Sequence, residues 1–122
     1  MDVTELTIYK NALRYLKPIY KLADLLPNRE YGLKSQLTKA AKSIAPMIHE
    51  GFAKKKSQPE FKRFLEMAMG SSDEVTTHLR EIKILTFPNV KEKTCDALID
   101  VYKTESKQIN QLIKIIIQNQ KK

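Results

Sequence analysis

Apolar residues recur with a helical period in four segments, which are separated by proline, glycine and polar residues. The pattern predicts helices over about residues 4–26, 33–54, 59–86 and 90–119. The apolar seam of the first helix is Leu6, Tyr9, Leu13, Leu16, Tyr20 and Ala23, and that of the second is Leu37, Ala40, Ala41, Ile44, Met47 and Ile48. The seam of the third helix is Phe61, Leu65, Ala68, Ser72, Val75, Leu79 and Ile82. The seam of the fourth helix is Leu98, Tyr102, Ile109, Leu112 and Ile116. In the first and third seams the spacing alternates between three and four residues, as in helices that pack nearly parallel. Four helices joined by short breaks predict one all-α domain over residues 1–122, an up-down-up-down antiparallel four-helix bundle.

Pro18, Pro46 and Gly70 fall well inside these predicted helices, away from their ends. Pro18 and Pro46 lack the backbone N–H of a helical residue, so we expect the first and second helices to bend near them. Gly70 lies in the middle of a helix, where glycine costs about 1 kcal/mol relative to alanine. We interpret Gly70 as a structural residue that lets two helices come close. Ser57 and Glu60 have the spacing of a capping box, which predicts that the third helix starts there.

Composition narrows the class of protein. With 122 residues, of which 42% are hydrophobic and 30% charged, the chain has the balance of one globular domain with its own core. The single cysteine, Cys95, excludes an intramolecular disulfide framework and suits a reducing cytosol. Asp2 and Glu5 stand where a signal peptide would carry basic residues, and no apolar run approaches the roughly 20 residues that span a bilayer. These features favour a cytoplasmic protein without a membrane segment.

Residues that carry enzyme chemistry are scarce. The only histidines, His49 and His78, lack the spacing of a metal site, and no glycine-rich phosphate loop is present. We therefore expect no enzyme, no catalytic or metal-ligating residue, no cofactor and no small-molecule substrate. Glu50 stands at the C-terminal end of a helix, where the helix dipole disfavours a carboxylate. We expect Glu50 to form a structural ion pair, with Lys54 or with a residue of another helix.

Positive charge is the strongest functional signal in the chain. The net charge is +8, and residues 1–63 carry +7 of it. Basic residues form a stripe along the first helix, continue on the second, and cluster around the connection that follows. The candidate nucleic-acid-binding residues are Lys10, Arg14, Lys17, Lys21, Lys39, Lys42, Lys54, Lys55, Lys56, Lys62 and Arg63. The alternative is a merely solvated helix face. No base-reading motif is present, so bound nucleic acid would be held by phosphate contacts.

The last predicted helix carries more apolar surface than one stripe. A helix of a monomeric bundle needs an apolar face about 100° wide. Excess apolar surface near a helix end is typical of a subunit interface. The candidate oligomer-interface residues are Ile113, Ile115, Ile116 and Ile117.

Short motifs in order along the chain resemble a known family. They are Leu26-Pro27, Glu30-Tyr31-Gly32-Leu33, Ser35-Gln36-Leu37, Ala40-Ala41, Ser43-Ile44, Glu50-Gly51-Phe52, Glu60-Phe61-Lys62-Arg63-Phe64-Leu65 and Ala68-Met69-Gly70-Ser71. The sequence is similar in these motifs to the bacterial four-helix-bundle proteins first noticed in intervening sequences of large-subunit ribosomal RNA genes. The family usually reads Ser-Ile-Pro-x-Asn-Ile-Ala-Glu-Gly where this chain has residues 43–51, so the proline has moved by one place and the asparagine is replaced by Met47. The Glu50-Gly51 pair matches, and we treat both residues as structural.

The resemblance implies a four-helix bundle that assembles as a ring-shaped homopentamer. It also implies a function, because a branch of the family includes the accessory variability determinant of diversity-generating retroelements, which binds a reverse transcriptase and its template RNA. Our first hypothesis is a non-catalytic accessory protein of this kind. The second is a ribosomal-RNA intervening-sequence protein of undefined role, and the third is a protein-only scaffold whose basic face binds an acidic protein.

Overall fold

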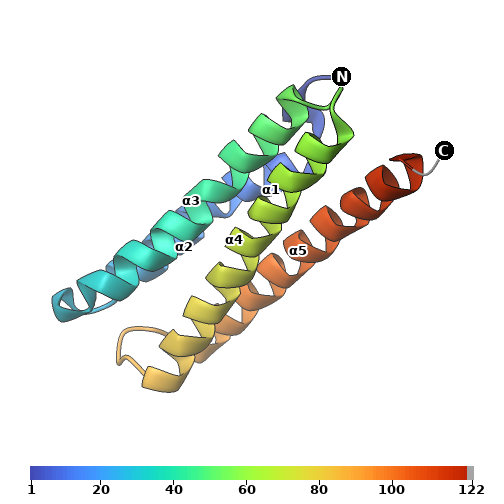
Figure 1. Ribbon diagram of the computed structural model, residues 1–122. Helices are drawn as coiled ribbons and strands as arrows, with labels where there is room; N and C mark the ends of the chain where they lie inside the picture. The colour runs from blue at the N-terminus through green and yellow to red at the C-terminus, as the bar shows by residue number, and fades with distance from the viewer. Residues whose placement is uncertain (121–122) are drawn as a thin grey trace.

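Helices run up and down in four antiparallel legs in the computed structural model, which describes the backbone of residues 1–120 and the side chains of residues 1–119 (Figure 1). The first leg consists of α1 (Thr7–Arg14) and α2 (Leu16–Asp24), and the others are α3 (Tyr31–Ala53), α4 (Gln58–Leu85) and α5 (Glu92–Gln120). Short 3₁₀ helices cover Val3–Glu5 and Asn28–Glu30, and no strand occurs in residues 1–120. The predicted all-α four-helix bundle is confirmed, and the predicted bounds of the last three helices differ from these by one or two residues.

The first leg is two helices because of Pro18. A proline has no N–H to donate to the carbonyl four residues earlier, and its ring crowds that carbonyl, which here belongs to Arg14. The helix breaks at Tyr15, the residue that directly follows Arg14, where ψ is 1°. Pro46 has a milder effect, since α3 continues through it.

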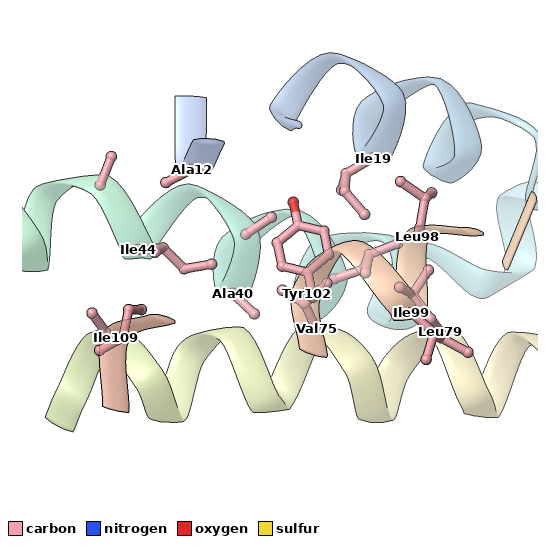
Figure 2. Close-up of a cluster of buried hydrophobic side chains, with 14 of the residues drawn as sticks. Ala12, Ile19, Ala40, Ile44, Val75, Leu79, Leu98, Ile99, Tyr102 and Ile109 are labelled. Atoms are coloured by element: carbon pink, nitrogen blue, oxygen red, sulfur yellow. The ribbon is translucent and has the colours of Figure 1, made fainter. Parts of the chain in front are cut away.

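The core lies between the four legs, and α4 packs against both α3 and α5 (Figure 2). The predicted seam of α4 is confirmed: its residues from Leu65 to Ile82 are at most 1% exposed. Ser72 belongs to this seam because its hydroxyl donates to the carbonyl of Tyr102 in α5 at 2.9 Å. Each fully buried leucine or isoleucine contributes about 1.5–3 kcal/mol relative to an exposed one, so this seam dominates the stability of the bundle.

The first leg buries a different stripe from the predicted one. Its core residues are Val3, Ile8, Ala12, Ile19, Leu22, Ala23 and Leu26. Of the predicted seam only Ala23 is fully buried; Leu13 is 47% and Tyr20 40% exposed. The prediction was wrong because this leg carries two apolar stripes, and spacing alone does not decide which one faces the bundle.

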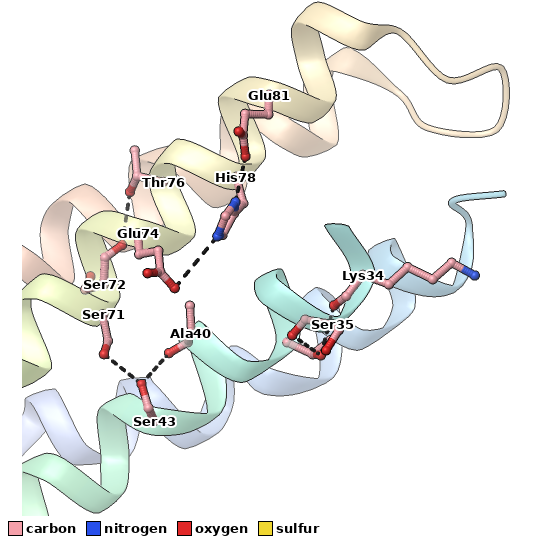
Figure 3. A network of polar contacts seen from close by, with 11 residues as sticks. Lys34, Ser35, Ala40, Ser43, Ser71, Ser72, Glu74, Thr76, His78 and Glu81 are labelled. Carbon is pink, nitrogen blue, oxygen red and sulfur yellow. Dashed lines mark hydrogen bonds and ion pairs between the residues drawn. The ribbon is translucent and has the colours of Figure 1, made fainter. Parts of the chain in front are cut away.

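Hydroxyl groups link the helices within the core. The Ser43 hydroxyl of α3 lies 2.7 Å from the Ser71 hydroxyl of α4 (Figure 3). On the other side of α4, the Ser106 hydroxyl of α5 donates to the Asp73 carboxylate at 2.7 Å and lies 2.8 Å from the Ser72 hydroxyl. These contacts fix the register of α4 against both neighbours at one level of the bundle.

The close approach of two helices occurs at Gly51, and the assignment to Gly70 was wrong. A Cβ atom at Gly70 would have no atom within 4 Å beyond its own helix. A Cβ atom at Gly51 would lie 3.1 Å from Cβ of Phe64 and 3.3 Å from the carbonyl oxygen of Phe61. The start of α4 therefore packs so close to the end of α3 that a side chain larger than glycine's would push the neighbouring atoms aside by a few tenths of an ångström.

The isoleucines near the end of α5 are largely core residues. Ile113 and Ile116 are each 4% exposed, so neither offers surface to another subunit, contrary to expectation. Ile117 is partly buried against the same core. Of the four candidate interface residues, Ile115 alone is largely exposed, at 53%.

One acidic residue lies inside the bundle. Glu105 occupies the step of the α5 seam between Tyr102 and Ile109, and it is 3% exposed. Neither carboxylate oxygen of Glu105 has a hydrogen-bond partner in the described part of the chain, and the same holds for Oε1 of Gln108 one turn later. Burial raises the pKa of the Glu105 carboxyl to about 8, so the neutral acid is the form that the folded protein favours at pH 7.

This pKa predicts a pH-dependent stability. An unfolded chain ionises Glu105 near pH 4.5, whereas the folded chain holds the proton to about pH 8. The folded state thus binds more protons between these values, and its free energy of unfolding falls as pH rises through this window. Glu105→Gln should remove this pH dependence and make the protein more stable than the parent at pH 8 by about 1 kcal/mol or more, because the neutral amide has no proton to lose. Urea unfolding of both proteins from pH 4 to pH 9 measures the difference, and parallel curves would contradict the assignment.

The two glycines give a matched pair of stability predictions. Gly70→Ala should raise the free energy of unfolding by about 0.5–1 kcal/mol, because alanine favours the helix and nothing opposes its methyl group. Gly51→Ala should lower it by about 1 kcal/mol or more, because the added methyl group meets the backbone of α4. Thermal unfolding followed by circular dichroism distinguishes the two variants, and equal shifts in Tm would show that α4 yields at Gly51.

Candidate nucleic-acid interface

Three phenylalanines surround the turn from α3 to α4, which lies at the same end of the bundle as the N-terminus (Figure 1). Helix α3 ends at Ala53 and α4 begins at Gln58. The rings of Phe52 and Phe61 pack edge to face, with centroids 6.4 Å apart. Phe64 lies one turn further along α4, where its Cβ atom faces Gly51. The missing side chain of Gly51 thus allows this aromatic cluster to form.

Cations lie over the faces of these rings. Nζ of Lys55 is 4.0 Å from the centroid of the Phe52 ring. The Phe64 ring has two cations near it, Nζ of Lys54 at 4.8 Å and the guanidinium carbon of Arg63 at 4.5 Å. Such contacts contribute about 0.5–1 kcal/mol at exposed sites, less than the rotamer entropy of about 2 kcal/mol of a lysine or arginine. The aromatic cluster therefore favours conformations that keep basic groups around this end of the bundle.

Carboxylates offset only part of this charge. The expected ion pair of Glu50 with Lys54 is present at 3.9 Å, and Lys62 pairs with Glu66 at 3.6 Å. A shorter pair joins Glu60 to Arg63 at 3.0 Å. Lys55 and Lys56, both exposed, form no ion pair within the described residues.

The Glu60–Arg63 pair also explains why the expected capping box is absent. Ser57 precedes α4, but its side chain makes no capping hydrogen bond. Glu60 turns instead toward Arg63, whose hydrogen bond is the main cause of a lowered pKa of the Glu60 carboxyl. The carboxylate that would cap the helix is thus engaged with a cation of the turn.

The candidate basic residues fall on two surfaces. Lys54, Lys55, Lys56, Lys62 and Arg63 gather at the α3–α4 turn, and we call these five residues the basic turn. Lys10, Arg14, Lys17 and Lys21 are exposed along the outside of α1 and α2, and Lys39 and Lys42 are exposed on α3. The basic turn is the compact group, whereas the other six residues are spread along the side of the bundle.

The contact of cations with aromatic rings was not recognised in the sequence. The periodicity places Phe61 in the apolar seam of its helix, and the structure shows both Phe61 and Phe64 partly buried. The signal that could have revealed the arrangement is the alternation in Phe61-Lys62-Arg63-Phe64, with three further lysines just before it. The partner of each ring depends on the turn between two helices, which spacing along one helix does not describe.

His78 and Cys95 are buried within the bundle. His78 is buried, with Nδ1 at 2.6 Å from Oε1 of Glu81 and Nε2 at 3.7 Å from Oε2 of Glu74 (Figure 3). Cys95 is 1% exposed, and burial raises the pKa of its thiol. Within the described residues, no three His, Cys, Asp or Glu side chains are grouped so as to hold a metal ion. None of the described helices is long and apolar enough to cross a membrane.

Comparison with known proteins assigns the chain to a family. A search of curated proteins finds no match. The family model described as 23S rRNA-intervening sequence protein matches residues 4–116, which include the first three legs of the bundle, the basic turn and most of α5. The resemblance seen in the sequence motifs is confirmed: the chain belongs to the 23S rRNA-intervening sequence protein family.

Proposed function

We propose that this protein is a non-catalytic, cytoplasmic RNA-binding accessory protein that works as a homo-oligomer. The observation that supports RNA binding is the basic turn, where five cations face three carboxylates and aromatic rings contact three of the cations. Phosphate groups bind such a surface by charge and by counterion release, without reading the base sequence. Structured RNA is therefore the expected ligand, and its binding should weaken steeply with salt.

Two biological settings fit this activity. In the more specific one, the protein serves a diversity-generating retroelement, and the basic surface brings the template RNA to a reverse transcriptase. In the other, it is an intervening-sequence protein of a ribosomal RNA gene, and the family match favours this setting. A neighbouring reverse-transcriptase gene supports the first setting, and a position inside a ribosomal RNA gene supports the second.

Self-association into a pentameric ring is the second part of the proposal. It rests on the family resemblance and on apolar side chains at the surface, among which Ile115 of α5 is 53% exposed. A closed ring requires two different surfaces that meet head to tail. The exposed Ile115 would contribute to one of them.

RNA binding can be tested at the basic turn. Changing Lys54, Lys55 and Lys56 together to Ala should weaken binding of a labelled structured RNA at least tenfold, because three phosphate contacts are lost. The fold should survive, since all three side chains are exposed. A titration at two salt concentrations measures both the affinity and its salt dependence.

The matched control changes Lys91, Lys93 and Lys103 to Ala, which removes the same charge from exposed positions near and on α5. This variant should keep most of the affinity. Equal loss in both variants would mean that net charge alone attracts the RNA. Unchanged affinity in the first variant would remove the basic turn from the RNA-binding surface.

Oligomer formation can be tested at the end of α5. Ile115→Asp should dissociate the oligomer, because a charge would be buried between subunits while the fold of each subunit is left intact. Sedimentation velocity gives the mass in solution. The control is Ile84→Asp, an equally non-conservative change at a position of α4 that is 84% exposed. Dissociation by the control alone would place the interface at the other end of the bundle.

A further inference from the structure

The first leg presents a second apolar stripe that the bundle covers only in part: Leu6, Tyr9 and Leu16 pack against the edge of the core, and Leu13 and Tyr20 are exposed. It consists of Leu6, Tyr9, Leu13, Leu16 and Tyr20, with the alternating spacing of three and four residues that is typical of helix–helix packing. None of the five is fully buried, and Leu13 and Tyr20 are 47% and 40% exposed. The core is filled by the other stripe of the same leg, which includes Ile8, Ala12 and Ile19. We call this set of five the outer stripe.

A groove runs beside the outer stripe, between the first leg and α3. Tyr9, Leu13 and Leu16 line one side. Lys42, Ala45, Pro46 and His49 of α3 line the other side, and the cavity volume is about 440 Å³. The lining is therefore apolar except for Lys42 and His49.

The charges around this groove are of one sign. Lys42 belongs to its wall, Lys10 lies one turn before Leu13, and Lys17 lies one turn before Tyr20. No acidic residue occurs between Leu6 and Ala23 or between Tyr31 and His49. An occupant therefore has to supply apolar side chains for the stripe and negative charge for its borders.

We propose that the outer stripe and its groove bind an acidic amphipathic helix of a partner protein. The helix would lie along the first leg, with its apolar face on Leu13 and Tyr20 and its carboxylates beside Lys10, Lys17 and Lys42. A nucleic acid fits this surface less well, because a row of apolar side chains has nothing to offer phosphate groups. A second copy that pairs through the same face brings two sets of these lysines together, and like charges repel; a head-to-tail contact with a different surface of a second copy is the alternative that sedimentation of Leu13→Glu tests. The site is separate from the basic turn and does not depend on RNA binding there.

The test uses designed helical peptides of three heptads as probes. The first carries leucine along one face and glutamate on its flanks; the second has lysine in place of every glutamate; the third keeps glutamate but has serine in place of leucine. Binding of the fluorescent peptides to the full chain is followed by anisotropy, and helix formation by circular dichroism. We expect the first peptide to bind at least tenfold more tightly than either of the others and to become helical.

Two variants locate the site. Leu13→Glu should weaken binding of the first peptide at least tenfold, since it places a like charge on the apolar stripe, and the exposed position tolerates the change. Ile84→Glu, at a more exposed apolar position outside the groove, should leave binding unchanged. The variant with Lys54, Lys55 and Lys56 changed to Ala should still bind the peptide, and Leu13→Glu should still bind RNA. Failure of either proposal is therefore distinguishable from failure of the other.

Three outcomes would overturn the proposal. Equal binding by the lysine peptide would show that apolar contact alone attracts the helix. Unchanged binding by Leu13→Glu would place the peptide elsewhere on the chain. A fall in mass of Leu13→Glu in sedimentation, from oligomer to monomer, would show that a second copy of this chain covers the stripe.

Discussion

The burial of α4 between α3 and α5 is the constraint on which the rest of the structure depends. Its seam from Leu65 to Ile82 is sealed from water on both sides, and hydroxyl pairs across each interface fix the register. A helix buried along two faces tolerates few rotations, because each rotation exposes apolar area and breaks these hydrogen bonds. The position of α4 therefore sets the geometry of both turns, and with it the surface at each end of the bundle.

The basic turn is a consequence of that position. Because α4 starts against α3, glycine is favoured at position 51, and the approach brings Phe61 and Phe64 next to the last turn of α3. The rings in turn contact Lys54, Lys55 and Arg63. A preorganised set of cations loses less side-chain entropy when it binds a polyanion than the same cations on free chains do. The packing of α4 against α3 thus gives the cations of this loop preferred positions on the protein surface.

Two features depart from an optimally stable bundle. Glu105 lies in the core without a hydrogen-bond partner among the described residues, where an apolar residue would cost less, and the outer stripe leaves Leu13 and Tyr20 in water. Departures of this kind are expected where function competes with stability. The outer stripe has a role in our proposal, as the docking surface for an acidic helix. The contacts within one chain give Glu105 no such role.

The sequence by itself determined the helices, their order and three of the four core seams, because a helix that buries one face must repeat apolar residues at a period near 3.6. It also located the basic turn, since Lys54, Lys55 and Lys56 are neighbours in the chain and need no fold to bring them together. The tertiary structure alone decided which of two apolar stripes the first leg buries, because a one-dimensional pattern carries no direction toward the core. It likewise assigned the close contact to Gly51 rather than to Gly70, and core positions to Ile113 and Ile116 rather than positions at a subunit surface. Each of these depends on which neighbouring helix stands opposite a residue, and that is a property of the packed bundle rather than of any one segment.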